Sequence, residues 1–360
     1  MTRRAPKHLG PRSRRAARSH RTQFDPEGSH RSRLFEGFLL KYRFAHSIMH
    51  CLAVAGLTAL IYPRFVAPYR WRLTRYDMPF ANLPPEFAGY KILQLSDFHL
   101  GRTRVSYIES VITRCLQEKP DLIVLTGDLI HYHPDGLAAL PQILNLLKPA
   151  TSGGPAPSSL DTGHRTLDTP PVLAIFGNHD YHEYSWRHIG KRSAHRSIHR
   201  RLAGLVQSAG ITLLRNQLHT IRRGSALLQI VGMDELWAGN FDPAAAFAHV
   251  DPAQPCVCLQ HNPDGCAQLQ NYPWQWMLCG HSHGGQLDLP ILGPMYIPQE
   301  HRHWLRGFFH FPAGPSGGGG GGPRPCSSPP ASATPPPSAF ASLPKPPSSP
   351  SPAQPLVPRP

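Results

Sequence analysis

The stretch KILQLSDFH, residues 91–99, decides the fold. It is a short apolar run that ends in an acidic residue and a histidine, Asp97 and His99. Two later stretches have the same form: DLIVLTGD at 121–128 and VLAIFGNHD at 172–180. Runs of Val, Ile and Leu without polar alternation indicate strands that are buried on both faces. The sequence therefore predicts a layered α/β domain.

Other segments extend this pattern. Apolar residues at helical spacing predict helices over 107–118, 137–147 and 199–208. Further strands are predicted over 211–216, 226–234, 257–262 and 276–281. The folded domain is expected to span residues 76–311, with a surface loop over the Gly-, Pro- and Ser-containing residues 150–171.

The composition indicates segments that do not fold and an anionic partner. The 360 residues include 41 prolines and carry 37 Lys and Arg against 22 Asp and Glu, a net charge of +15. A positive surface attracts phosphates, nucleic acid or an acidic membrane. The seven cysteines are odd in number and widely spread. We expect them to be reduced, which favours a cytoplasmic environment.

The N-terminal region divides into a basic arm and an apolar segment. Residues 1–43 hold twelve Lys and Arg and three Asp and Glu, and we expect this arm to be disordered. Residues 44–62 contain no charged side chain but include His46, Ser47 and His50. This segment is near the lower limit of about 17 residues for a membrane span. We expect it to associate with a membrane; a buried or interfacial helix is the alternative.

The C-terminal region, residues 313–360, contains 16 prolines and a run of six glycines, 317–322. Such a composition does not build a hydrophobic core, so we expect a disordered tail.

Polar residues follow five of the predicted strands. Because ligands bind beyond the carboxyl ends of strands in α/β sheets, these residues are expected to converge on one site. Carboxylate, imidazole and amide groups together suit two divalent ions, with Mn²⁺, Fe, Zn²⁺ and Mg²⁺ as the candidates. Two such ions clamp a phosphoryl group and lower the pKa of a bound water. The residues are Asp97 and His99, Asp128, Asn178 with His179 and Asp180, His261, and His281 with His283.

These blocks, in this order, resemble the signature of the calcineurin-like metallophosphoesterases. The resemblance covers residues 91–286 and implies a four-layer α/β sandwich, with two mixed sheets flanked by helices. It implies a first metal bound by Asp97, His99 and His283, and a second bound by Asn178, His261 and His281. Asp128 resembles the bridging ligand. His179 resembles the non-ligand histidine that stabilises the phosphoryl oxygens or protonates the leaving group, and Asp180 would orient it.

Residues 76–101, the HNPD at 261–264 and the GHSHGGQLDLP at 280–290 resemble a membrane-linked bacterial branch of this superfamily. That branch includes a form of UDP-2,3-diacylglucosamine pyrophosphatase, an enzyme of lipid A synthesis. The resemblance implies a phosphorylated small-molecule or lipid substrate, an anionic membrane surface as partner, and a catalytic domain on the cytoplasmic side of the inner membrane. Nucleotides and other phosphodiesters are the alternative substrates.

The chain departs from this branch at its C-terminus, where further strands close the second sheet in the relatives. We hypothesise that the tail from about Ala313 is a shifted reading frame or a degenerated end, which would leave the second sheet without an edge strand. A nucleic-acid- or membrane-binding protein with an inactive core is the rival interpretation. Every motif position is filled, which argues against an inactive core. Nucleic acid is the less favoured partner, and no sequence feature indicates an oligomeric state.

Three smaller features each have an ordinary structural explanation, and for two of them a functional alternative stays open. Cys256, Cys258, Cys266 and Cys279 lack the paired spacing of a zinc site, so we expect small core residues. A basic cluster at 187–201 is either a solvated face or a contact to an anionic lipid. Trp237 is either a core aromatic or a platform for substrate.

Overall fold

The protein is described here by a computed structural model. The described residues are 26–61, 69, 71–131, 134–148, 170–181, 192–283, 288–289, 293–294, 299–301, 304–305, 307–311, 324–328 and 338–342. The chain divides into two compact units, residues 1–60 and 61–360.

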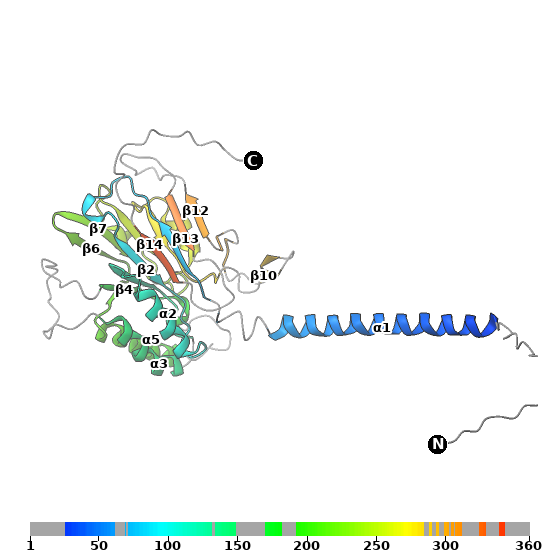
Figure 1. Ribbon diagram of the computed structural model, residues 1–360. Coiled ribbons are helices and arrows are strands. Elements are labelled where there is room, and N and C mark those ends of the chain that lie inside the picture. Colours follow the sequence, from blue (N-terminus) through cyan, green and yellow to red (C-terminus); the bar gives the residue numbers. More distant parts are fainter. Residues whose placement is uncertain are drawn as a thin grey trace, which may run out of the picture. The chain divides into compact units, whose positions relative to one another are not determined.

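The first unit is dominated by one long helix, α1, Pro26–Ile61 (Figure 1). Its described side chains are exposed, including large apolar ones such as Phe38, Leu40 and Phe44. The expected disorder of residues 1–43 is therefore wrong for 26–43, and residues 1–25 lie outside the described part. Among the described residues, no helix combines the length and the hydropathy that a membrane span needs.

The first sheet of the second unit has six strands in the order β1-β14-β2-β3-β4-β5. The strands β2, β3, β4 and β5 pair in parallel, as buried apolar runs predict. β14 pairs antiparallel with β2 and parallel with β1, so the sheet is mixed. The bounds are β1 Leu73–Asp77, β2 Lys91–Leu95, β3 Leu122–Thr126, β4 Val172–Ile175, β5 Thr212–Leu213 and β14 Ser338–Ser342.

The second sheet also has six strands, in the order β12-β13-β9-β8-β7-β6. β7, β8 and β9 are parallel, while β6 and β12 pair antiparallel with their neighbours. The bounds are β6 Gln217–Arg223, β7 Ala226–Gly232, β8 Cys256–Leu259, β9 Trp276–Leu278, β12 Gly307–Phe311 and β13 Arg324–Ser328. A separate two-stranded pair is formed by β10, Asp288–Leu289, and β11, Gly293–Pro294.

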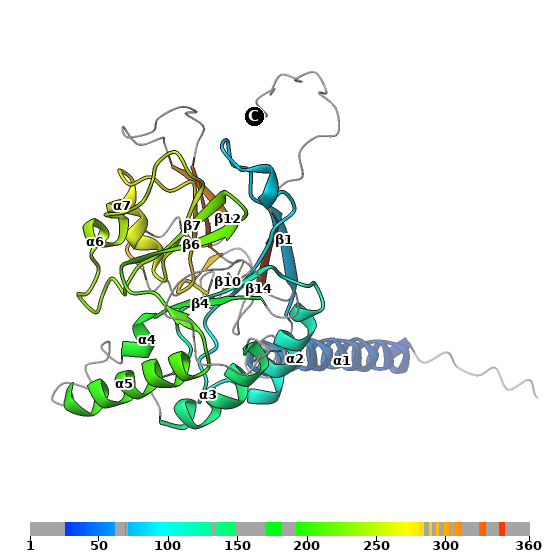
Figure 2. The same ribbon diagram turned by 90° about the vertical axis from the view of Figure 1, so that its left-hand side faces the viewer.

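The layers follow from three apolar clusters. The central cluster joins the facing sides of the two sheets, with Val124 and Ile175 from the first sheet and Ile230 and Leu259 from the second. A second cluster packs three helices on the outer side of the first sheet: α2 Val105–Leu116, α3 Pro134–Leu147 and α5 Arg192–Ser208 (Figure 2). A third packs α6, Pro243–Phe247, and α7, Cys266–Leu269, on the second sheet. The predicted four-layer α/β sandwich is confirmed.

Short helical turns complete the domain. They are the 3-10 helices η3, Pro85–Phe87, and η5, Pro263–Gly265, and the helix α4, Asn178–Tyr181. The four cysteines at 256, 258, 266 and 279 are buried in the core, as predicted, and none of them forms a disulfide.

The C-terminal region corrects the sequence prediction. Residues 324–328 and 338–342 form β13 and β14, so disorder throughout 313–360 is wrong for these ten residues. The second sheet has β12 and β13 beside β9, and the inference that it lacks an edge strand is also wrong. Backbone hydrogen bonds build a strand even where composition argues against it. The first strand of the second unit, β1, begins at Leu73.

Candidate metal centre

The loops that follow β2 and β3 are joined by backbone hydrogen bonds. The amide of Asp97 donates to the carbonyl of Gly127 at 2.9 Å, and the amide of His99 donates to the carbonyl of Asp128 at 3.0 Å. These bonds hold the carboxylates of Asp97 and Asp128 at the same edge of the first sheet. The two carboxylates are fully buried, which requires compensating partners.

Five of the predicted ligands have a left-handed backbone. Their φ angles are +56° for Asp97, +45° for His99, +54° for Asp128, +69° for His281 and +44° for His283. Such a conformation is uncommon for non-glycine residues and costs about 1–3 kcal/mol each. The surrounding structure must stabilise it, and strain of this kind clusters at functional sites.

The site contains two groups of side chains that share Asp128. One group is Asp97, His99, Asp128 and His283, and the other is Asp128, His261 and His281; within each, one ligand atom per residue lies within 4.8 Å of the others. Nε2 of His99 lies 2.9 Å from Nε2 of His283. Nε2 of His261 lies 3.3 Å from Oδ1 of Asp128. Asp128 is thus central, where the resemblance places the bridging ligand.

Asn178 extends the second group. Its Oδ1 lies 2.9 Å from Nδ1 of His281 and 3.3 Å from Nε2 of His261. The structure therefore brings together all seven predicted ligands. Two glycines make this close approach feasible, because a Cβ on Gly127 would lie 2.5 Å from Nδ1 of His261 and one on Gly280 would lie 2.7 Å from Oδ2 of Asp97.

Burial and the histidines set the protonation of the site. Burial favours a raised pKa for Asp128, but the neighbouring His261 and His179 outweigh it and hold the pKa of Asp128 well below its usual range. Burial favours a lowered pKa for His261, but Asp128 raises that pKa to about 10. Burial lowers the pKa of His99 and raises that of Asp97. Cations that bind here displace protons from these groups.

His179 lies beside the shared carboxylate, as expected. Its amide donates to Oδ1 of Asp128 at 2.9 Å, and its Nε2 lies 4.0 Å from Oδ2 of Asp128. Burial lowers the pKa of His179 to about 4, so the ring is neutral near pH 7 in the absence of cations.

The carboxylate of Asp180 has different hydrogen-bond partners from the predicted one. Its Oδ2 accepts from the amide of Gly177 at 2.9 Å, and its Oδ1 accepts from the amide of Ile130 at 3.1 Å. Burial, with Asp128 nearby, raises the pKa of Asp180 to about 8. These bonds connect the loops after β3 and β4, whereas the sequence interpretation gave Asp180 the task of orienting the His179 ring.

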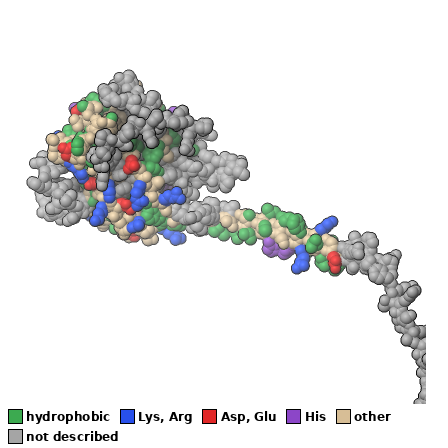
Figure 3. Space-filling view, turned by 45° about the horizontal axis from the view of Figure 1, so that its top comes forward, with side chains coloured by type: hydrophobic (Ala, Val, Ile, Leu, Met, Phe, Trp, Pro, Cys, Tyr) green, Lys and Arg blue, Asp and Glu red, His purple; other side chains and the backbone are tan. Residues whose placement is uncertain are grey.

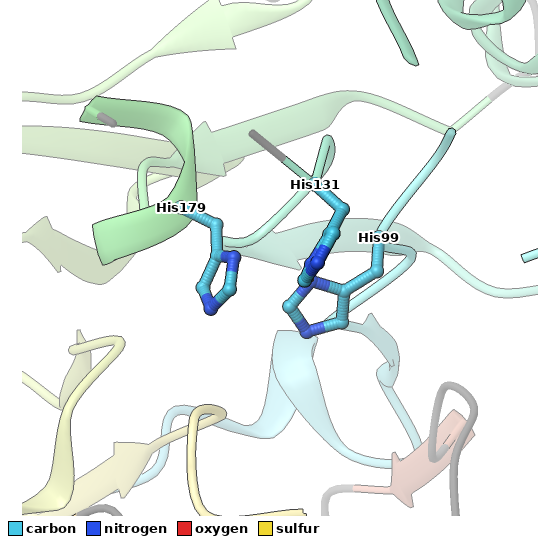
Figure 4. Close-up of side chains that lie close together, drawn as sticks. All are labelled: His99, His131 and His179. Carbon is cyan, nitrogen blue, oxygen red and sulfur yellow. The ribbon is translucent and has the colours of Figure 1, made fainter. Parts of the chain in front are cut away.

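Sequence analysis did not predict two residues near the site, His131 and Glu235, and left the role of a third, Trp237, open. His131 joins His99 and His179 in a third group of histidines (Figure 4). Glu235 is buried, its Oε2 accepts from the amide of Ala238 at 2.7 Å, and burial raises its pKa to about 7. The ring of Trp237 lies 4.7 Å from that of His281. The only sequence signal for His131 and Glu235 was their position after a strand, in GDLIH and VGMDELW.

The donor set fits two divalent ions. Carboxylates, imidazoles and one amide oxygen converge from both sheets on two adjoining groups, and a shared carboxylate joins them. Mn²⁺, Fe, Zn²⁺ and Mg²⁺ all accept ligands of these kinds. The buried cluster can therefore hold a dinuclear metal centre.

A four-layer α/β sandwich with such a cluster at its strand ends defines a metal-dependent phosphoester hydrolase. Residues 90–285 match the calcineurin-like phosphoesterase family, and the chain belongs to that family.

Individual proteins are similar over most of the domain. The chain is 31% identical to phosphodiesterase YaeI of Escherichia coli K12, over 72% of this chain and 83% of that protein. It is 28% identical to UDP-2,3-diacylglucosamine pyrophosphatase LpxG of Chlamydia muridarum, over 72% of this chain and 85% of that protein. A solved dimetal phosphatase from Danio rerio has 12% identity and a TM-score of 0.38, over 72% of this chain and 94% of that one.

Proposed function

We propose that this phosphoesterase hydrolyses phosphodiester or pyrophosphate bonds at the cluster around Asp128. Asp97, His99, Asp128 and His283 hold one divalent ion, and Asp128, Asn178, His261 and His281 hold the second. The single observation that supports this assignment is the meeting of two ligand groups at one buried carboxylate. Two bound ions supply positive charge for the phosphoryl oxygens and acidify a water molecule.

The remaining residues act on the substrate directly or through the loops. His179 is neutral near pH 7 and lies beside Asp128. Its ring donates a hydrogen bond to a phosphoryl oxygen, which stabilises the charge that develops there. Asp180 keeps the loops after β3 and β4 in register through two backbone amides. It is a positioning residue.

The substrate proposed is an amphiphilic pyrophosphate such as UDP-2,3-diacylglucosamine. The similarity to LpxG supports this choice. The net charge of +15 and the exposed Arg196, Arg200 and Arg201 of α5 favour an anionic surface. Apolar side chains such as Leu52 and Leu57 are exposed along α1 (Figure 3). We propose that the protein associates with a membrane surface through these residues, with its catalytic domain on the cytoplasmic side.

A second candidate is a phosphodiesterase that acts on smaller, water-soluble diesters. The similarity to YaeI, a protein named as a phosphodiesterase, favours it. The two candidates share the site and differ only in the substrate.

One experiment tests both candidates. Full-length protein is assayed with Mn²⁺ or with chelator on bis(p-nitrophenyl) phosphate and on UDP-2,3-diacylglucosamine in mixed micelles. We expect chelator-sensitive hydrolysis, with higher kcat/KM on the lipid substrate. Hydrolysis of the soluble diester alone would favour the second candidate. No metal-dependent hydrolysis of either substrate would contradict the proposal.

A further inference from the structure

Arg102 lies next to the histidines of the metal centre, in the turn after β2. Its amide donates to the carbonyl of His99 at 3.0 Å. Its Nη1 lies 3.2 Å from Nε2 of His131. The turn thus carries a ligand at one end and directs a guanidinium toward His131 at the other.

His131 connects Arg102 to the site. Its Nδ1 lies 3.3 Å from Nδ1 of His99, and its ring stacks on that of His179 with centroids 4.8 Å apart (Figure 4). The amide of His131 donates to the carbonyl of Leu100 at 2.9 Å, which fixes its backbone on the β2 loop. Arg102 is therefore one imidazole ring away from both His99 and His179.

The charge of Arg102 is not compensated by a carboxylate. Three other described arginines each pair with an acid: Arg75 with Glu118, Arg215 with Asp234 and Arg223 with Asp121. Within the described part of the chain, no ion pair joins Arg102 to Asp or Glu, and its neighbour is an imidazole. A guanidinium only donates hydrogen bonds, and Arg102 is exposed to solvent. It is free to bind an anion that reaches the site.

We propose that Arg102, oriented by His131, forms an anion subsite that binds the second phosphoryl group of a pyrophosphate-linked substrate. This inference rests on the proposed function and deepens it, because it selects substrates with two adjacent phosphates over those with one. A guanidinium presents paired N–H groups that match phosphate oxygens, and such charge-assisted bonds are stronger than neutral ones. His131 lies between the arginine's guanidinium and the rings of His99 and His179, which leaves room for a second phosphoryl group beside the one that is cleaved.

The test uses the full chain loaded with Mn²⁺ and two probes, methylenediphosphonate and inorganic phosphate, in isothermal titration calorimetry. The wild-type protein should bind the diphosphonate more tightly than phosphate. In Arg102→Gln the ratio of the two affinities should fall about 10-fold. Arg102→Lys should recover part of the ratio, because lysine keeps the charge without the planar fork.

Arg104→Gln is the matched control. Arg104 is exposed, lies two residues further along the same turn and places its guanidinium 5.1 Å from the ring of Tyr69. Its loss should leave the affinity ratio unchanged. An equal change in Arg102→Gln and Arg104→Gln, or an unchanged ratio in Arg102→Gln, would overturn the subsite.

The proposed function is tested separately, by metal-dependent hydrolysis of a phosphodiester by the wild type. If hydrolysis is present and the ratio does not move, only the subsite fails. If hydrolysis is absent, the function fails and the subsite with it.

Discussion

The two sheets contribute unlike groups to the site. The loops of the first sheet supply Asp97, His99, Asp128 and Asn178, and therefore both carboxylates. The loops of the second sheet supply only histidines: His261, His281 and His283. Each ligand group combines residues from both sheets, so neither sheet alone holds a complete metal site. The packing of the sheets through the central apolar cluster is what assembles the centre.

The sheets are alike in how they use the C-terminal segment. In the first, β14 lies between β1 and β2, and in the second, β13 lies between β9 and β12. The strands that precede the ligands remain contiguous in both sheets: β2, β3 and β4 in the first, and β8 and β9 in the second. The C-terminal strands carry none of the ligands, and the strands that precede the motif residues position all of them.

The largest effect is expected from removing these C-terminal strands. A chain that ends after Phe311 loses β13 and β14, so β12 and β1 lose their partners. It should lose most of the roughly 5–15 kcal/mol that stabilises a domain. A chain that ends after Ser342 should unfold like the full protein. Urea unfolding followed by circular dichroism measures both, and equal midpoints for the two chains would show that the strands are dispensable.

The next effect concerns the one carboxylate that both ligand groups share. Asp128→Asn should lower kcat at least about 1,000-fold, because the amide cannot bridge two cations, and metal analysis should find both sites weakened. Asp121→Asn is the control. Asp121 lies just before β3, whereas Asp128 lies just after it, and Oδ1 of Asp121 is 2.7 Å from Nη2 of Arg223. The control should retain its activity and metal content. A full metal complement and full turnover in Asp128→Asn would remove Asp128 from the centre.

A smaller effect concerns Glu235, a buried acid in the loop that follows β7 of the second sheet. Its pKa is raised by burial from 4.5 to about 7. Below pH 4.5 both the folded and the unfolded states hold the proton. Between about pH 4.5 and 7 only the folded state holds it, so stability falls as the pH rises through this window. The free energy of unfolding should fall by about 3 kcal/mol in all across this window, at roughly 1.4 kcal/mol per pH unit.

Glu235→Gln should remove this part of the pH dependence, because glutamine stays neutral and keeps an oxygen for the amide of Ala238. The measurement is urea unfolding of chelator-treated protein at pH 5 and pH 7.5. Glu118, an acid whose pKa is lowered by its hydrogen bond from Arg75, provides the control: Glu118→Gln should leave the decline between these pH values in place. An identical decline in the wild type and in Glu235→Gln would mean that Glu235 is ionised in the fold.

The site residues were easier to predict from the sequence than the outer and C-terminal strands of the two sheets. Asp97 and Asp128 each follow a buried apolar run, and parallel strands bring such positions together, so a local pattern predicted a distant contact. Asp180 shows the limit of this reasoning. The motif predicted that its carboxylate orients the ring of His179, whereas the carboxylate oxygens accept hydrogen bonds from the amides of Gly177 and Ile130. Which donor reaches a carboxylate depends on loop geometry that the motif does not encode.

The C-terminal strands show a second limit. RPCSS at 324–328 and SAFAS at 338–342 have no strand pattern of their own, since Pro and Ser are depleted in strands. Their pairing is decided by strands elsewhere in the chain: β14 pairs with β1 and β2, and β13 pairs with β9 and β12. Strand β6 at 217–223 was missed for a related reason, because its alternating polar residues give it only one buried side chain, Ile221.

The smallest effects are expected from replacing one of two glycines by alanine, one beside the first sheet and one in the second. Gly204 lies within α5, on the helical layer of the first sheet, and Gly224 lies in the turn between β6 and β7 of the second. A Cβ would meet no atom within 4 Å at either position. They differ in backbone, because Gly224 has a φ of +60°. Gly204→Ala should stabilise the protein by about 1 kcal/mol through helix propensity. Gly224→Ala should destabilise it by about 1–2 kcal/mol, since alanine is strained in the left-handed region. Thermal unfolding measures the two shifts, and shifts of the same sign would show that packing, not backbone conformation, decides both positions.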